Sequence, residues 1–102
     1  TFDASGNLWV PDYGAGTVTE YQAASLSGTP TTGTAISASG PVTVVFAASG
    51  NLWLADYTAG TVTEYQAASL SGTPTTGTQI TGLSQPYGVA FDPPPYDLPL
   101  SH

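Results

Sequence analysis

The sequence predicts an all-β protein built from two tandem copies of one antiparallel four-stranded unit. The first reason is an internal repeat, since residues 2–34 align with residues 46–78 at an offset of about 44 positions. The second is that glycine and proline interrupt every window long enough for a helix, while β-branched residues fill the runs between them. Both observations favour short strands joined by turns, with at most one helical turn at residues 23–26.

The elements of one unit follow in order from residue 42. Strands are expected at 42–46, 52–55, 61–66 and 77–81, with turns at 48–51 and 56–60 and a Ser/Thr/Gly/Pro loop at 67–76. In the first of these strands, Val42, Val44 and Phe46 share one face. The second strand is apolar on both faces, which is expected of a strand that lies between two packed sheets. The third is β-branched and more polar, so it is expected nearer the outside.

The two copies of the unit are close to identical. They differ at four aligned positions, which are Asp3/Ala47, Val10/Leu54, Pro11/Ala55 and Gly14/Thr58. The likeness resumes at residues 41–46 and 86–91, and the linker before the second of these segments is longer by a single residue. A period of about 40–45 residues with several short strands per unit is typical of a β-propeller blade.

Four short motifs recur in the order of such a blade. They are Pro-x-Gly-Val-Ala-Phe-Asp at 86–92, Gly-Asn-Leu-Trp-Val at 6–10, Asp-Tyr at 12–13 and Thr-Val-x-Glu-Tyr at 17–21. This pattern resembles the NHL-repeat family of β-propellers over nearly all of residues 1–92, and it implies a fold rather than a function. Thr17 and Thr61 stand where that family carries a basic residue, so no role of that residue carries over.

The chain is out of phase with its own blades. Residues 1–45 form a blade-like repeat that lacks its innermost strand, residues 46–92 form a second repeat with an extra innermost-type strand at 86–92, and residues 93–102 form a Pro-rich C-terminal tail. Two blade-equivalents cannot close a propeller, so closure or extension is expected through oligomerisation, unless the chain is cut from a longer propeller. A chain that lacks Met and begins Thr-Phe-Asp is expected to be a processed product or an excised segment.

The extra strand suggests how copies of the chain join. We expect it to complete the first repeat of a neighbouring copy by β-augmentation, because an unpaired strand position is an edge that proteins rarely leave bare. The residues expected to carry this contact are Pro86, Tyr87, Val89 and Phe91 in the strand, and Tyr96, Leu98 and Leu100 in the tail. The alternative for the tail is a stiff, weakly ordered end after three prolines. Head-to-tail contacts of this kind close into a ring or grow into a filament.

Charge excludes several functions. The chain has no Lys or Arg and seven acidic residues, which give a formal net charge of −7. Such a chain cannot neutralise phosphates, which argues against binding nucleic acid or docking on anionic lipid, and no apolar stretch approaches the ~20 residues of a membrane span. Without Cys, neither a disulfide nor a thiolate metal site can support a thin core, which again favours oligomerisation. The Thr-, Ser- and Gly-rich composition suggests an extracellular or cell-surface protein.

Aromatic residues are the candidates for ligand binding. Trp9 and Trp53 lie in the second strands of the two units, and Tyr13 and Tyr57 follow these strands on a turn. Aromatic side chains at the seams between blades can stack on carbohydrate. The alternative, which we favour for the two tryptophans, is packing between blades. Buried tryptophans would support a structural role, and solvent-facing tryptophans would support a lectin-like one.

Acidic residues recur as well. Asp12 and Asp56 end the second strands, where a ring of carboxylates could gather calcium, but a turn that caps nearby backbone N–H groups is the favoured interpretation, so no metal site is assigned. Glu20 and Glu64 are expected on a solvated strand face rather than as an acid–base pair. With a single His, at residue 102, and no Cys or Lys, the chain offers no nucleophilic triad and no zinc cluster.

The sequence therefore predicts a non-catalytic extracellular structural protein, without a cofactor, that self-assembles head to tail by strand donation. The alternative is a lectin-like propeller module that binds carbohydrate. A propeller enzyme of the lyase type is the weakest of the three, because the His and basic residues that such chemistry draws on are missing.

Overall fold

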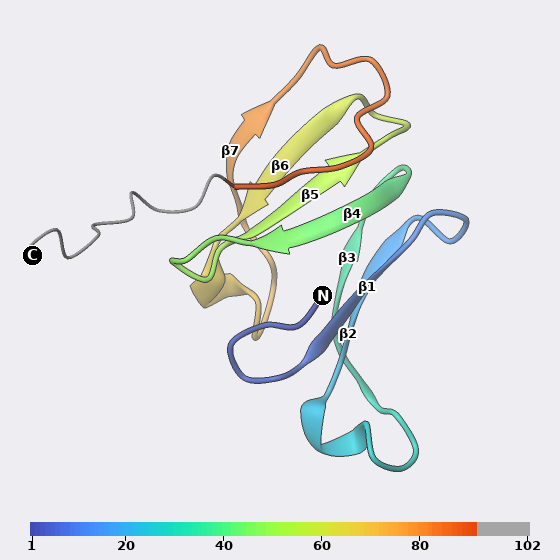
Figure 1. The fold of residues 1–102 in the computed structure, drawn as a ribbon, viewed down its shortest axis with the longest axis vertical. Coiled ribbons are helices and arrows are strands. Elements are labelled where there is room, and N and C mark those ends of the chain that lie inside the picture. The colour runs from blue at the N-terminus through green and yellow to red at the C-terminus, as the bar shows by residue number, and fades with distance from the viewer. Residues whose placement is uncertain (92–102) are drawn as a thin grey trace, which may run out of the picture.

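The computed structural model describes residues 1–91 and contains two antiparallel sheets (Figure 1). The first sheet has the order β1 (Leu8–Asp12), β2 (Thr17–Tyr21) and β3 (Thr32–Ser37). The second has the order β4 (Pro41–Phe46), β5 (Leu52–Asp56), β6 (Thr61–Tyr65) and β7 (Thr76–Ile80). Two 3-10 turns, η1 (Ala23–Ser25) and η2 (Ala67–Ser69), follow β2 and β6. The prediction of an all-β fold with short strands is confirmed, and the two sheets do not close a ring.

The sheets and the sequence repeats are offset by one strand. The second copy of the repeat begins at residue 46, but the second sheet begins at Pro41, because β4 pairs with β5 along its length. The first sheet has no such inner strand. Thr1 alone exchanges backbone hydrogen bonds with Trp9, and Phe2 bridges to Leu8. Three strands therefore stand in one sheet and four in the other.

The turns that follow β1 and β5 each end in a glycine. This glycine also fixes the position of the segment that follows the outer strand of its sheet, β3 or β7. Gly16 and Gly60 have φ of 70° and 71°, a conformation that L side chains rarely adopt. The carbonyl of Gly16 accepts the N–H of Ala38, and the carbonyl of Gly60 accepts the N–H of Leu83. Leu83 thus occupies the place of Ala38. Because the second linker is longer by one residue, residues 83–91 are equivalent to residues 38–46 at an offset of 45 positions.

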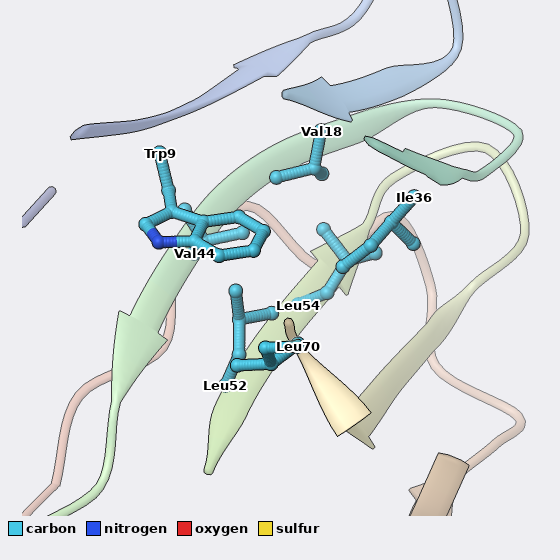
Figure 2. Packing of buried hydrophobic residues seen from close by; sticks show 7 residues of the cluster. All are labelled: Trp9, Val18, Ile36, Val44, Leu52, Leu54 and Leu70. Carbon is cyan, nitrogen blue, oxygen red and sulfur yellow. The ribbon is translucent and has the colours of Figure 1, made fainter. Parts of the chain in front are cut away.

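The hydrophobic core lies between the faces of the two sheets (Figure 2). The first sheet contributes Trp9, Val18 and Ile36, and the second side contributes Val44, Leu52, Leu54 and Leu70. Burial of side chains of this size stabilises the fold by about 1.5–3 kcal/mol each. Alternation along β5 places Leu52 and Leu54 toward the first sheet and Trp53 toward the opposite face.

After β7 the chain crosses back over the second sheet on the face that points away from the first (Figure 1). Residues 86–91, expected as a strand, have no strand partner within the described residues and adopt no assigned strand there. The physical reason is that the backbone N–H and C=O groups of a strand need hydrogen-bond partners on a neighbouring strand. The side chains nevertheless dock, because Phe91 contacts Trp53 and Tyr87 contacts Tyr57.

Candidate functional site

The buried seam between the sheets shows how two units of this protein associate. Trp9 is almost fully buried and meets the ring of Phe46 edge-on at 6.0 Å between centroids. At the outer end of the seam, the Thr34 hydroxyl donates to the carbonyl of Leu70 at 2.5 Å. The seam therefore combines an apolar centre with a polar contact at its rim, which is the usual anatomy of a specific protein interface.

The free face of the second sheet carries the repeat equivalents of the first sheet's half of this seam. Trp53, Val62, Ile80 and Thr78 correspond to Trp9, Val18, Ile36 and Thr34. Ile36 is 3% exposed, whereas Ile80 is 46% exposed. On the outside of the molecule Ile80 and Thr78 are thus exposed, whereas Trp53 is half-buried and Val62 stays buried.

The free face of the first sheet carries the other half of the seam. Leu8, Val10 and Leu26 correspond to Leu52, Leu54 and Leu70. Leu54 is 2% exposed and Val10 is 38% exposed, while Leu70 and Leu26 are 9% and 37% exposed. The two outer faces of the molecule are therefore complementary in kind. Among the three residues compared, Val10 is smaller than Leu54 by one methylene group, and the first sheet has no inner strand to supply a counterpart of Val44.

Residues 86–91 lie against the second sheet as β4 lies against the first. The ring of Phe91 meets Trp53 edge-on at 5.9 Å, which repeats the contact of Phe46 with Trp9. The carbonyl of Tyr87 accepts the Thr43 hydroxyl at 2.6 Å. Chain segments that follow each sheet therefore take the same place, but β4 continues into a sheet and residues 86–91 do not.

The edge of β1 is open beyond Trp9. Antiparallel pairing alternates, so after the pair formed by Trp9 and Thr1 the next backbone groups on this side belong to Pro11, which has no N–H. Its equivalent in the filled sheet is Ala55, which pairs with Thr43 and is fully buried. Proline on an edge strand limits unselective pairing, and this edge carries fewer backbone hydrogen-bonding groups than the corresponding edge of β5.

Asp12 ends β1 and Asp56 ends β5, two equivalent strands, but the two carboxylates have different surroundings. Asp56 is buried and accepts the N–H groups of Ala59, Ser39 and Gly40, each at 2.9 Å. Burial raises the pKa of Asp56, but these hydrogen bonds outweigh it and leave the pKa below its ordinary value of 3.8. Asp12 is exposed and accepts the N–H of Ala15 at 3.1 Å. The predicted turn capping is present at both residues, and at Asp56 it extends to the connection that leads into β4.

A carboxylate–amide pair that the sequence analysis did not assign occurs in both units. Glu20 accepts the Asn7 side-chain amide at 2.9 Å and the N–H of Thr34 at 3.0 Å, and the Asn7 carbonyl oxygen accepts the N–H of Ala23. The prediction that Glu20 lies on a solvated strand face was wrong, because this side chain is 7% exposed. The signal was the conserved spacing of Asn and Glu in the two copies.

Glu64 forms the same pair in the second unit. It accepts the Asn51 amide at 2.8 Å and the N–H of Thr78 at 3.0 Å. The bond from Thr78, together with that from Asn51, lowers the pKa of Glu64 below 4.5. Each glutamate therefore ties its strand to the outer neighbouring strand and to the turn before β1 or β5.

Asp3 holds the turn at the start of the first unit. Its carboxylate accepts the indole N–H of Trp9 at 3.0 Å and the backbone N–H groups of Ser5 and Asn7 at 2.9 Å. Burial raises the pKa of Asp3, but these bonds outweigh it and leave the pKa below 3.8. The predicted hairpin turn is confirmed. The second unit has Ala47 at this position, so Trp53 has no equivalent carboxylate.

The four aromatic candidates are divided between the core and the surface. Trp9 is buried between the sheets, and Trp53 is partly covered by Phe91. Tyr13, Tyr57 and Tyr87 form a row with centroid separations of 5.9 and 5.6 Å. This row, with Val42, lines a hollow of about 420 Å³. Of the four residues, the tyrosines are therefore the ones that face solvent as a group.

Three of the residues expected to contact a neighbour, Tyr96, Leu98 and Leu100, lie outside the described residues. Among residues 1–91, no group of three or more His, Cys, Asp or Glu side chains is placed to hold a metal ion. No helix in that part of the chain is long and apolar enough to cross a membrane. Comparison with protein-family models, with curated proteins and with solved structures finds no match for this chain.

Proposed function

We propose that this protein is a non-catalytic structural subunit, exported from the cell, that associates head to tail with copies of itself through NHL-like propeller blades. The observation that carries the proposal is the contact of Phe91 with Trp53, which repeats that of Phe46 with Trp9. Residues 86–91, which have the sequence of an inner strand, thus already dock on the second sheet, and the three strands that would complete their blade are those that open the chain. A second copy supplies β1, β2 and β3.

The complementary faces support this joint. Docking the first sheet of one copy onto the second sheet of another brings Val10 and Leu26 against Trp53, Val62 and Ile80, as Leu54 and Leu70 meet their counterparts in the internal seam. Residues that are more than a third exposed, such as Ile80 and Leu26, then become buried. The apolar burial supplies most of the association free energy, as in other specific interfaces.

Backbone pairing between residues 86–91 of one copy and β1 of the other would set the register of the joint. Thr1 and Phe2 already occupy the positions opposite Trp9 and Leu8, so the donated segment pairs with β1 beyond Trp9. In the register of β4 on β5, Val89 then stands opposite Val10 and Pro86 opposite Asp12. The lost N–H at Pro11 makes this pairing short. Strand donation alone is weak here, and the sheet faces carry the joint.

A carbohydrate-binding module is the second candidate. The observation in its favour is the row formed by Tyr13, Tyr57 and Tyr87 over a hollow, because aromatic rings with polar tips suit sugar stacking. In its favour too, the row runs across both sheets and would lengthen at each new joint. Against it, the buried Trp9 cannot reach a ligand.

The test has two parts: it measures the mass of the assembly that the intact chain forms, and it cross-links two chains across the proposed joint. Light scattering with negative-stain imaging should reveal discrete oligomers or filaments at micromolar concentration. Since the chain has no Cys, a mixture of Leu26→Cys chains and Thr78→Cys chains should form disulfide-linked dimers of one chain of each kind. These two positions are the equivalents of Leu70 and Thr34, which are in hydrogen-bond contact inside one chain.

Two matched controls define the outcome. A single chain with Thr34→Cys and Leu70→Cys should form an internal disulfide, which confirms that the geometry permits the bond. A mixture of Thr73→Cys and Thr78→Cys chains tests for unspecific oxidation, because both positions are exposed on the side of the second sheet and a head-to-tail joint does not bring them together. A folded monomer without mixed dimers would contradict the proposal, and a glycan-dependent change in tyrosine fluorescence of that monomer would favour the carbohydrate-binding module.

A further inference from the structure

We propose that Asp12 accepts the backbone N–H groups of Ser84 and Gln85 from a second copy of this chain and thereby latches the head-to-tail joint. This inference rests on the proposed self-association. It assigns to Asp12 a binding role that its position at the end of a strand does not by itself reveal.

The template for the latch is inside the molecule. Asp56 accepts the N–H groups of Ser39 and Gly40, which connect β3 with β4 and so lead the chain from one sheet into the inner strand of the next. The carboxylate is buried where it receives these bonds. Hydrogen bonds to a charged group are stronger than those between neutral groups, so the pair is a strong determinant of where the inner strand begins.

At the proposed joint between two copies, the hydrogen-bond donors and the acceptor of this latch lie at opposite ends of one chain and do not meet each other. Ser84 and Gln85 are the equivalents of Ser39 and Gly40, and within residues 1–91 neither of their N–H groups has a hydrogen-bond acceptor. Asp12 is the equivalent of Asp56, and it is exposed with one bond from Ala15. Two unpaired donors at one end of the molecule thus match one underused acceptor at the other end.

The sizes of two facing residues support the same pairing independently: one of the two is glycine at each joint, but on opposite sides. A Cβ added at Gly40 would overlap the side chain of Thr58, so the filled sheet needs a glycine opposite a threonine. At the joint between copies the residues are reversed, because Gln85 replaces Gly40 and Gly14 replaces Thr58. A Cβ at Gly14 meets nothing closer than the Asp12 carboxylate at 3.9 Å. The space that Thr58 fills in one unit is therefore free in the other for Gln85.

The connection is not yet in its docked conformation. Gln85 has φ of 55°, and it is the non-glycine residue of the described chain with positive φ. Gly40 has no such conformation. Side chains disfavour this region, so we expect the Gln85 backbone to leave it when Asp12 of the second copy binds.

The experiment measures self-association of the full 102-residue chain by sedimentation velocity over a concentration series. Asp12→Ala should weaken association roughly 100-fold, and Asp12→Asn should weaken it less because one acceptor oxygen remains. Gly14→Thr should also weaken association, by overlap with Gln85. Adding Gln85→Gly to Gly14→Thr recreates the combination of Gly40 with Thr58, and it should restore association to near the wild-type level.

The outcomes separate this inference from the proposed function. A wild-type chain that stays monomeric contradicts the self-association itself. A wild-type chain that associates while Asp12→Ala associates equally well contradicts the latch alone, as does failure of Gln85→Gly to rescue Gly14→Thr. Circular dichroism melts of each variant report folding, and the rescue pair keeps the test decisive if Asp12→Ala folds poorly.

Discussion

The ring of Phe91 lies edge-on to Trp53 with centroids 5.9 Å apart and planes inclined by 74°, nearly the geometry of Phe46 on Trp9 at 6.0 Å and 68°. The first pair lies on the outside of the molecule and the second in its core. Side chains that hold the two sheets together thus recur at the surface, and the same chemistry is available to hold two chains together.

Leu54→Ala and Val10→Ala distinguish the internal seam from the outer face. Leu54 is fully buried between the sheets, so its truncation should lower the free energy of unfolding by about 2–5 kcal/mol. Val10→Ala should lower the stability of the monomer by less than about 1 kcal/mol and should weaken self-association instead. Denaturant unfolding at low protein concentration measures the first effect, and sedimentation the second. Equal loss of monomer stability in both variants would contradict this assignment of faces.

Pro11→Ala should strengthen self-association. The substitution supplies an N–H on the open edge of β1, where a donated strand carries Gly88 in the place of Thr43. The reverse change, Ala55→Pro, removes an N–H from a filled ladder and should cost the fold about 1–3 kcal/mol or more. Sedimentation of Pro11→Ala beside the wild type checks the first expectation. Unchanged or weaker association would argue that no strand pairs with this edge.

Stability should decrease in acid. The folded-state pKa values of Asp3, Asp56 and Glu64 are all lowered, so folding favours their ionised forms. Their contribution is complete above the unfolded-state values of 3.8 and 4.5, and it is lost as the pH falls through the lower folded-state values. The Tm should therefore be flat above about pH 5 and fall below about pH 4. Asp56→Asn should make this fall shallower, and a Tm that is constant down to pH 3 would contradict the role of these carboxylates.

Glu20→Ala should destabilise the fold more than Glu64→Ala does. Glu20 is nearly buried, so its removal leaves the N–H of Thr34 without its acceptor inside the protein and leaves the Asn7 amide with its longer bond to Asp3, at a cost of about 1–3 kcal/mol. The equivalent groups around Glu64 are more exposed and can bond to water. Thermal melts of the two variants at neutral pH make the comparison. Similar losses would mean that burial does not distinguish the two positions.

The sequence by itself determined the strands and turns of this protein. The alternation of apolar residues, the β-branched runs and the glycines at 16 and 60 act within a few residues, so they specify local structure wherever the repeat occurs. The strand bounds expected for the second unit agree with the structure to within one residue at each end. Strand formation at 86–91 could not be determined locally, because it depends on a partner strand.

Only the tertiary structure decided which copy of each residue is buried. Asp12 and Asp56 share nearly the same local sequence, yet one is exposed and the other is buried under the connection into β4. Ile36 and Ile80 differ in the same way, and Trp9 is buried where Trp53 is half-buried. The physical reason is that burial requires a neighbouring sheet, and each unit has such a neighbour on one side alone. This asymmetry leaves one outer face on each sheet and the edge of β1 beyond Trp9 without a neighbouring sheet or strand in the described residues.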